Sequence, residues 1–116
     1  MLEMVGSEVE LSARKCKPCE GGTPPMVEKE VKAMLEKVDD WEWRENKIRK
    51  GFKFKDFSES MKFVNSVAAL AEEEGHHPNI FISWNRVTLT LTTHAIGGLS
   101  VNDFILAAKI DKFRAC

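Results

Sequence analysis

Apolar residues recur at spacings of three and four in three separate segments of the chain. This spacing puts the apolar side chains on one side of an α-helix, so each segment is predicted to be an amphipathic helix with a buried face. The predicted helices cover residues 26–38, 58–74 and 100–113.

Between the predicted helices, apolar and polar residues alternate, which is the pattern of half-buried strands. The alternating apolar residues of the first pair of strands are Trp41, Trp43, Ile48, Phe52 and Phe54, and the second pair covers residues 79–84 and 86–93. Asn46-Lys47 and Asn85 stand at the expected reversals. Strands that follow one another in pairs favour an antiparallel sheet. We therefore expect an α+β fold, with three helices packed on one face of a four-stranded antiparallel sheet.

Several residues carry signals for the ends of these helices. Thr23 is a suitable N-cap with Pro24 at the first helical position, and Ser58 can cap the second helix. Gly75 is expected to end that helix in a left-handed conformation. Ser100 with Asp103 three residues later resembles a capping box, which would begin the last helix.

Residues 1–25 are expected to form an N-terminal arm ahead of a single domain over residues 26–116. The second half of the arm, KCKPCEGGTPP, is rich in Pro and Gly and cannot hold a regular helix. Its Cys16-x-x-Cys19 motif could bind zinc or cycle as a disulfide, but no second ligand pair and no thioredoxin-like context accompany it. An ordered, non-catalytic arm is the interpretation that we adopt.

The last predicted helix has two apolar stripes on roughly opposite sides. One consists of Val101, Phe104, Ile105 and Ala108, and the other of Leu106, Ile110 and Phe113. Because one core absorbs one stripe, the second predicts self-association as a homodimer or homotetramer through this helix. The alternative is that the N-terminal arm folds over the second stripe.

Composition narrows the class of protein further. The chain has 116 residues, of which 43% are apolar and 30% charged, and its formal net charge is −1. This balance does not favour direct binding of nucleic acid or of an anionic membrane. A basic stretch from Arg44 to Lys55 is flanked by acidic residues and is interpreted as a solvated strand face, with an electrostatic role toward an anionic ligand or partner as the alternative.

The lack of a recognisable targeting signal and the number of cysteines favour a cytoplasmic protein. No apolar run approaches the roughly 18–20 residues that span a bilayer, and the N-terminus lacks the pattern of a secretory signal. The three cysteines, an odd number, favour a reducing compartment.

All three histidines lie between residues 76 and 94. His76 and His77 follow the end of the second predicted helix and His94 ends the last strand, so they can meet where a helix end lies beside a strand end. Histidine both gives and takes protons near neutral pH, and Glu72, four residues before His76, could hold one ring in a single tautomer. The alternatives are a helix-stop loop at His76-His77-Pro78, a buried structural His94, and a zinc site; adjacent histidines rarely bind one metal.

The spacing of these residues resembles a known family. The sequence carries Glu72, His76-His77-Pro78, Trp84, Thr93-His94 and Asp103 at the spacings of the pterin-4a-carbinolamine dehydratase signature. The flanking segments WEW, FKFKDF and FVNSVAALAEE also resemble this family, so that the likeness covers roughly residues 26–113. It implies a four-stranded antiparallel sheet with three helices on one side, assembled as dimers or tetramers.

The resemblance also implies the chemistry. The substrate would be 4a-hydroxytetrahydrobiopterin, left when an aromatic amino acid hydroxylase has used its pterin, and the products quinonoid dihydropterin and water, in tetrahydrobiopterin recycling. No redox cofactor and no metal are implied. Loss of hydroxide requires protonation of the leaving oxygen while a ring nitrogen gives up a proton, which is work for an acid and a base.

The site residues are carried over as follows. His76 and His77 are expected to donate protons to the leaving hydroxyl, His94 to position the pterin, and Glu72 to orient His76 or supply basicity. The expected substrate-binding residues are Pro78, Trp84, Thr93, Ala95 and Asp103.

Two residues depart from the family pattern. Gly75 stands where members often have Asp, and Ile80 replaces a common aromatic residue. Neither removes a proton-transfer group, so we expect activity.

The chief rival is a non-enzymatic binding or assembly module. Family members also serve as dimerisation partners of a homeodomain transcription factor, and relatives act as assembly factors. A complete set of histidines favours the enzyme and is compatible with a second role as a coactivator partner.

Overall fold

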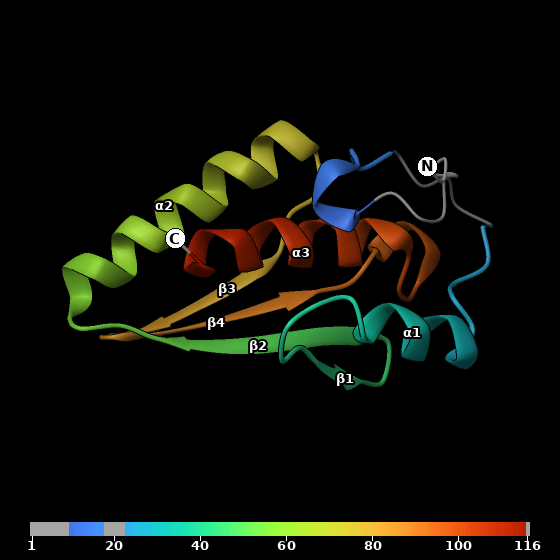
Figure 1. Ribbon diagram of the computed structural model, residues 1–116, viewed down its shortest axis with the longest axis horizontal. Helices are drawn as coiled ribbons and strands as arrows, with labels where there is room; N and C mark the ends of the chain where they lie inside the picture. The colour runs from blue at the N-terminus through green and yellow to red at the C-terminus, as the bar shows by residue number, and fades with distance from the viewer. Residues whose placement is uncertain (1–9, 18–22, 116) are drawn as a thin grey trace, which may run out of the picture.

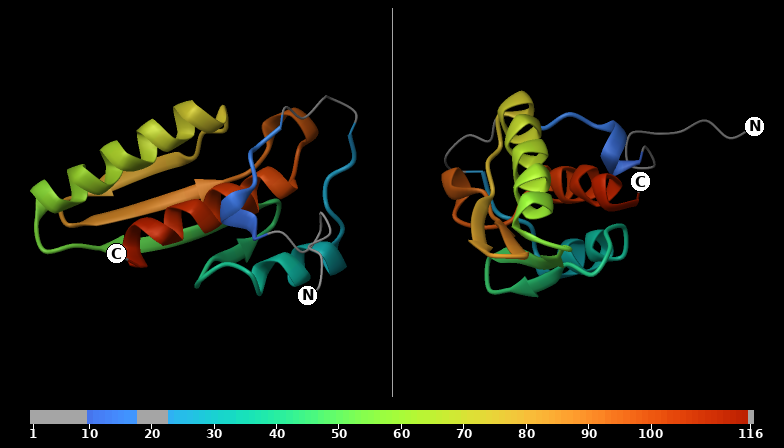
Figure 2. Two further views of the ribbon diagram at one scale, coloured as in Figure 1. Left: turned by 45° about the horizontal axis from the view of Figure 1, so that its top comes forward. Right: turned by 90° about the vertical axis from the view of Figure 1, so that its left-hand side faces the viewer.

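The computed structural model describes residues 10–17 and 23–115, and the side chains up to residue 113. The described chain forms an α+β fold built on one antiparallel sheet in the order β1-β2-β4-β3. The strands are β1 (Glu42–Arg44), β2 (Lys47–Lys53), β3 (Asn79–Ser83) and β4 (Arg86–Leu91). The helices are α1 (Glu28–Leu35), α2 (Phe57–Glu74) and α3 (Val101–Ala115), with short 3₁₀ turns η2 (Leu11–Ala13) and η3 (His94–Ile96). The predicted fold class is confirmed: the helices lie on one side of the sheet (Figures 1 and 2).

The alternation of the strands puts one set of apolar side chains against the helices. In the register of the sheet, Ile48 faces Leu91 and Phe52 faces Val87, and all four are buried. Both strand pairs turn within two residues, the first at Glu45-Asn46, one residue earlier than predicted, and the second at Trp84-Asn85. Glu45 and Trp84 have positive φ angles of 54° and 55°, which suits the first position of a tight hairpin turn.

Helix α2 has one buried stripe and well-defined ends. Phe63, Val64, Val67 and Ala71 are buried at the spacing that the sequence predicted. Gly75 ends the helix with a φ of 67°, as expected. The predicted cap at Ser58 is wrong, because the Asp56 side chain accepts a hydrogen bond from the Glu59 N–H at 2.9 Å. Asp56 has the extended backbone of an N-cap, whereas Ser58 already lies inside the first turn.

Replacing Asp56 with alanine is expected to lower the free energy of unfolding by about 1 kcal/mol, because the first turn of α2 loses an acceptor for its N–H groups. Ser58→Ala is the matched control and should change stability by less than about 0.5 kcal/mol, as for most surface substitutions. Urea denaturation of the two variants measures both values. Equal midpoints for the two variants would contradict the assignment of the cap.

Helix α1 begins later and ends earlier than the pattern predicted. Thr23 and Pro24 precede the helix as irregular chain, and Val27 is the N-cap. The Met26 N–H donates to the Leu99 carbonyl at 2.9 Å, so this residue is bound to a distant loop rather than to the helix. The Val27 N–H donates to the Glu30 side chain at 3.1 Å, which begins the helix there.

Both apolar stripes of α3 are buried within the single chain. Phe104, Ile105, Leu106 and Ile110 are each at most 2% exposed, whereas Phe113 lies on the surface. Helix α3 lies between the sheet and η2 of the N-terminal arm (Figure 2). The premise of an exposed second stripe is therefore wrong for Leu106 and Ile110, because both are buried within the single chain. The arm does not cover them: η2 lies beside Ala108 and Lys112, on the other side of α3. Among the described residues, no helix has the length and apolar character that a membrane span requires.

Part of the N-terminal arm is docked on the domain. Leu11 in η2 is buried in the main core, and Cys16 is partly buried beside Glu74 and Asn102. Cys19, the second cysteine of the motif, lies outside the described residues. Burial and the nearby Glu74 carboxylate raise the pKa of the Cys16 thiol to about 12.

Cys16 is expected to react with iodoacetamide at pH 8 roughly 10³-fold more slowly than a free thiol, because only the thiolate reacts and its fraction falls with the raised pKa. The rate should keep rising as the pH is raised toward 12, the pKa of this thiol. A Cys19→Ser, Cys116→Ser variant, followed by mass spectrometry, isolates this thiol, and the urea-unfolded chain is the reference. A folded-state rate equal to the unfolded one would show that the arm is not docked.

Candidate active site

Most of the expected site residues gather at one end of the sheet. Helix α2 ends at Glu74, and Gly75 turns the chain into His76-His77-Pro78, directly before β3. Asn79 at the start of β3 pairs with Thr90 near the end of β4, and His94 follows in η3. Because the two strands are antiparallel, the beginning of β3 and the end of β4 lie at the same end of the sheet. The N-terminal end of α3 lies at the same end of the sheet (Figure 1).

His76 and Asp103 form the central contact of this region. His76 Nε2 lies 2.6 Å from Asp103 Oδ1, and the exposed fractions of the two side chains are 12% and 0%. Since a carboxylate only accepts hydrogen bonds, His76 Nε2–H is the donor. This contact fixes the ring orientation and leaves Nδ1 as the nitrogen that can exchange a proton with a ligand.

Asp103 is held in turn by two donors from other elements. Its Oδ2 accepts hydrogen bonds from the Thr93 hydroxyl at 2.9 Å and from the Ser100 N–H at 3.0 Å. The second bond is half of the predicted capping box. The Ser100 hydroxyl also accepts from the Asn102 N–H at 3.2 Å. A buried carboxylate is stable only when such partners compensate for lost hydration. The cap of α3 and the partner of His76 are thus the same side chain.

This burial bears on the roles expected for two residues. Asp103 is fully buried, and its side chain contacts the His76 ring. Thr93 is also buried and its hydroxyl is bound to Asp103 and Ser100. Neither side chain is accessible in this structure, and their expected role in binding substrate stays a prediction.

Glu72 contacts a different histidine from the one expected. His77 Nε2 lies 2.6 Å from Glu72 Oε2, and the two side chains are 58% and 79% exposed. The expected pairing of Glu72 with His76 would need a helix that continued to residue 76. Gly75 ends the helix first, and the chain beyond it turns His77 toward Glu72 and His76 toward α3. An exposed pair of this kind contributes little to stability.

His94, Ala95 and Pro78 are available at the surface of the same region. His94 and Ala95 are exposed in η3, and Pro78 is half-buried beside the start of β3. Thr93, which precedes His94, is bonded to the carboxylate that holds His76. Asp103 thus links the segment after α2, which carries His76, to the segment after β4, which carries His94.

Trp84 is not part of this cluster within one chain. It lies in the hairpin turn at the far end of β3 and is 67% exposed. A five-residue strand separates it from Pro78, which corresponds to roughly 17–20 Å. The expectation that Trp84 binds substrate beside the histidines is not met within the single chain.

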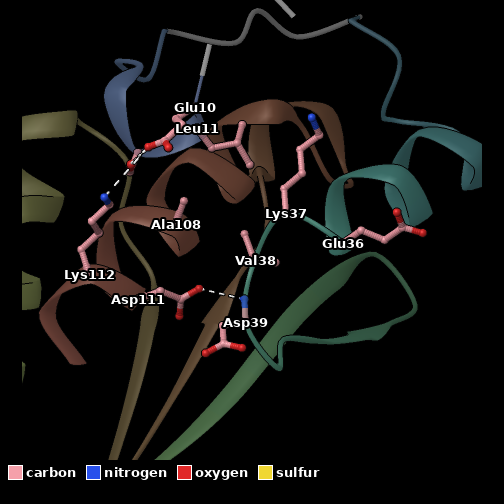
Figure 3. Close-up of a pocket in the computed structure, with 10 residues that line it drawn as sticks. Glu10, Leu11, Glu36, Lys37, Val38, Asp39, Ala108, Asp111 and Lys112 are labelled. Carbon is pink, nitrogen blue, oxygen red and sulfur yellow. Dashed lines mark hydrogen bonds and ion pairs between the residues drawn. The ribbon is translucent and has the colours of Figure 1, made fainter. Parts of the chain in front are cut away.

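Three cavities of the described chain lie elsewhere. A cavity of about 630 Å³ is bounded by η2, the C-terminal end of α1 and one side of α3 (Figure 3). Asp111 on its wall accepts hydrogen bonds from the Asp39 N–H at 2.9 Å and from the Trp41 indole N–H at 3.0 Å. Lys50 also pairs with Asp111, at 2.8 Å. Neither this cavity nor two others, of about 320 and 190 Å³, is lined by a histidine.

Comparison with known proteins identifies the family. The model of the pterin 4 alpha carbinolamine dehydratase family matches residues 24–113. The chain belongs to this family. A relative from Nitrosospira multiformis is 47% identical over 102 residues, which cover 88% of this chain and 90% of the relative. One from Rickettsia bellii is 48% identical over 104 residues, which cover 87% and 91%. Both names provisionally assign pterin-4-alpha-carbinolamine dehydratase activity.

Two solved structures are similar to this member of the pterin-4a-carbinolamine dehydratase family. The crystal structure of a transcriptional coactivator/pterin dehydratase from Brucella melitensis is 36% identical, has a TM-score of 0.73 and covers 76% of this chain and 96% of its own. A pterin dehydratase-like protein described as a RuBisCO assembly factor in the alpha-carboxysome is 29% identical, has a TM-score of 0.53 and covers 62% and 83%.

The family pattern flagged the histidines, Thr93 and Asp103, but not three other buried polar residues beside them. Glu74, Ser100 and Asn102 are buried in this chain. Only the Ser100–Asp103 spacing gave a signal in the sequence, as a capping box. Across residues 10–17 and 23–115, no three His, Cys, Asp or Glu side chains lie close enough together to hold a metal ion.

Proposed function

We propose that this chain is a 4a-hydroxytetrahydrobiopterin dehydratase, a hydro-lyase that converts pterin-4a-carbinolamine into quinonoid dihydrobiopterin and water. The observation that supports this most directly is the His76–Asp103 contact at 2.6 Å, at the junction of a helix exit and a strand exit. An imidazole oriented by a buried carboxylate is a recurrent arrangement for proton transfer.

In the proposed reaction, the bond between C4a and its hydroxyl oxygen breaks and its electron pair leaves with the oxygen. A proton from an imidazole converts this leaving group into water. The neighbouring ring nitrogen gives its proton to a base, and its electrons form the new double bond to C4a. Proton transfer of this kind contributes about 10²–10⁴-fold to the rate.

His76 is the proposed principal acid, because its contact with the buried Asp103 carboxylate fixes the ring. His77 is the second proposed donor, supported by its contact with Glu72. His94 is proposed to position the pterin ring, with Pro78 and Ala95 lining it. Asp103 and Thr93 are positioning residues in this scheme, because both are buried.

The proposal extends to the setting of the reaction. The protein would act in tetrahydrobiopterin recycling in the cytoplasm, and the proposed reaction uses no metal and no redox cofactor. It would act as a homodimer or homotetramer, but not through Leu106 and Ile110, which are buried within the chain.

The experiment that tests the function supplies enzymically generated carbinolamine to the purified chain and follows the quinonoid product optically. Acceleration over the spontaneous reaction, lost in the His76→Ala variant, is the expected result. A rate equal to that without protein would refute the proposed function.

A second candidate function is binding to another protein. It is favoured by the two similar structures, whose titles name a transcriptional coactivator and a RuBisCO assembly factor. In this alternative, the chain would form a stable complex with its partner, and the His76→Ala variant would form it equally well. Size-exclusion chromatography of chain and partner mixtures separates the two functions.

A further inference from the structure

The N-terminal arm is bonded to the residues next to the His76–Asp103 pair. The Cys16 N–H donates to Glu74 Oε1 at 2.8 Å, and Glu74 precedes His76 by two residues. The Lys17 N–H donates to Asn102 Oδ1 at 3.0 Å, and the Asn102 amide donates back to the Lys17 carbonyl. Asn102 directly precedes Asp103. The arm therefore contacts α2 and α3 at the two points where the chain leads into the site.

Glu74 is a buried charge that depends on the arm. Its carboxylate is paired with Lys109 on α3 at 2.5 Å, and Lys15 of the arm lies 4.0 Å away. Burial acts to raise the pKa of Glu74, but the Cys16 N–H and these two lysines outweigh it, so that the pKa lies below its usual value. Without the arm, this buried carboxylate would keep Lys109 as its partner and lose the others.

An apolar contact with the core also anchors the arm. Leu11 is only 4% exposed and belongs to the main core, while η2 lies on the outer side of α3 (Figure 2). An apolar anchor at one end and a set of hydrogen bonds at the other hold residues 10–17 across the helices. The side-chain carbonyl and amide of Asn102 bind the backbone N–H and the backbone carbonyl of Lys17. This pair of bonds fixes the arm in direction as well as in position.

We propose that residues 10–17 form a strap that fixes the end of α2 relative to the start of α3, and thereby sets the contact between His76 and Asp103. Glu74 and Asn102 are its positioning residues. This inference rests on the proposed dehydratase function. Each of the two contacting residues is supplied by a different helix end, so a change in the separation of these ends changes the hydrogen bond that orients His76.

The test uses two variants that release the strap at the same point. Asn102→Ala removes the paired hydrogen bonds from the helix side, and Lys17→Pro removes the Lys17 N–H from the arm side without altering α3. Lys17→Ala is the matched control, because it keeps the backbone groups that Asn102 binds. Each variant is assayed for dehydration, and its His76 ring N–H proton is observed by NMR.

Release of the strap is expected to lower kcat about 10-fold with KM changed less than about twofold, a smaller loss than the ~10²-fold that a 1 Å misplacement can cost. The His76 Nε2–H resonance should move upfield as the hydrogen bond lengthens, whereas Lys17→Ala should leave both unchanged. If the variants only melt earlier while kcat and the resonance stay as in the parent, the strap inference is refuted. If the parent chain has no dehydratase activity, the proposed function fails, and the resonance alone still decides whether the strap sets the contact.

Discussion

Replacing His76 with alanine is expected to lower kcat/KM for carbinolamine dehydration by about 10²–10⁴-fold, the loss typical of a general acid or base. The variant keeps the fold, because His76 lies at the surface end of its contact with Asp103. It does leave Asp103 with one oxygen unpaired, so a modest fall in stability is expected. Steady-state rates with generated carbinolamine measure the loss, and the circular dichroism spectrum checks the fold.

His77→Ala is the matched comparison for this variant. His77 is exposed and its partner Glu72 is exposed as well, so its ring is oriented less strictly and its removal should cost less than that of His76. An unimpaired His76→Ala variant would remove His76 from the acid role. Equal losses in the two variants would instead mean that the orientation of His76 by Asp103 does not increase the rate.

The periodicity of the chain was enough to predict the elements and the fold class. Alternation of residues such as Ile48 and Phe52 indicated the strands, and spacings of three and four indicated α2 and α3. The caps were harder to predict, because Ser58 and Asp56 both suit an N-cap and only the backbone conformation distinguishes them.

The partners of the histidines could not be predicted from spacing. Residues four apart are neighbours only within a continuous helix, and the left-handed Gly75 separates His76 from Glu72. The Asp103 side chain that binds His76 is 27 positions away in the sequence. The burial of Leu106 and Ile110 depends similarly on how α3 packs in the main core, which the spacing of apolar residues within one helix does not show.

Replacing Asp103 with asparagine is expected to lower kcat/KM by roughly 10²–10⁴-fold although the side chain is buried. Asparagine has nearly the same shape, and its carbonyl oxygen can still accept from Thr93 and from the Ser100 N–H. Its amide group then faces His76 Nε2 and donates where the carboxylate accepted. Nε2 must become an acceptor, so the doubly protonated ring that acts as the acid is no longer accommodated. The neutral ring, with its one proton on Nδ1, is too weak an acid for the step.

This result would distinguish orientation of His76 from general stability of the fold. Asp56→Asn makes the same chemical change at the cap of α2, where asparagine is an equally good cap, and should leave the rate and the unfolding midpoint close to those of the parent chain. The ¹⁵N shifts of the His76 ring report the tautomer directly. If Asp103→Asn retained the parent rate with the original tautomer, the carboxylate would be a cap for α3 alone, and the proton transfer would have to depend on His77 or His94.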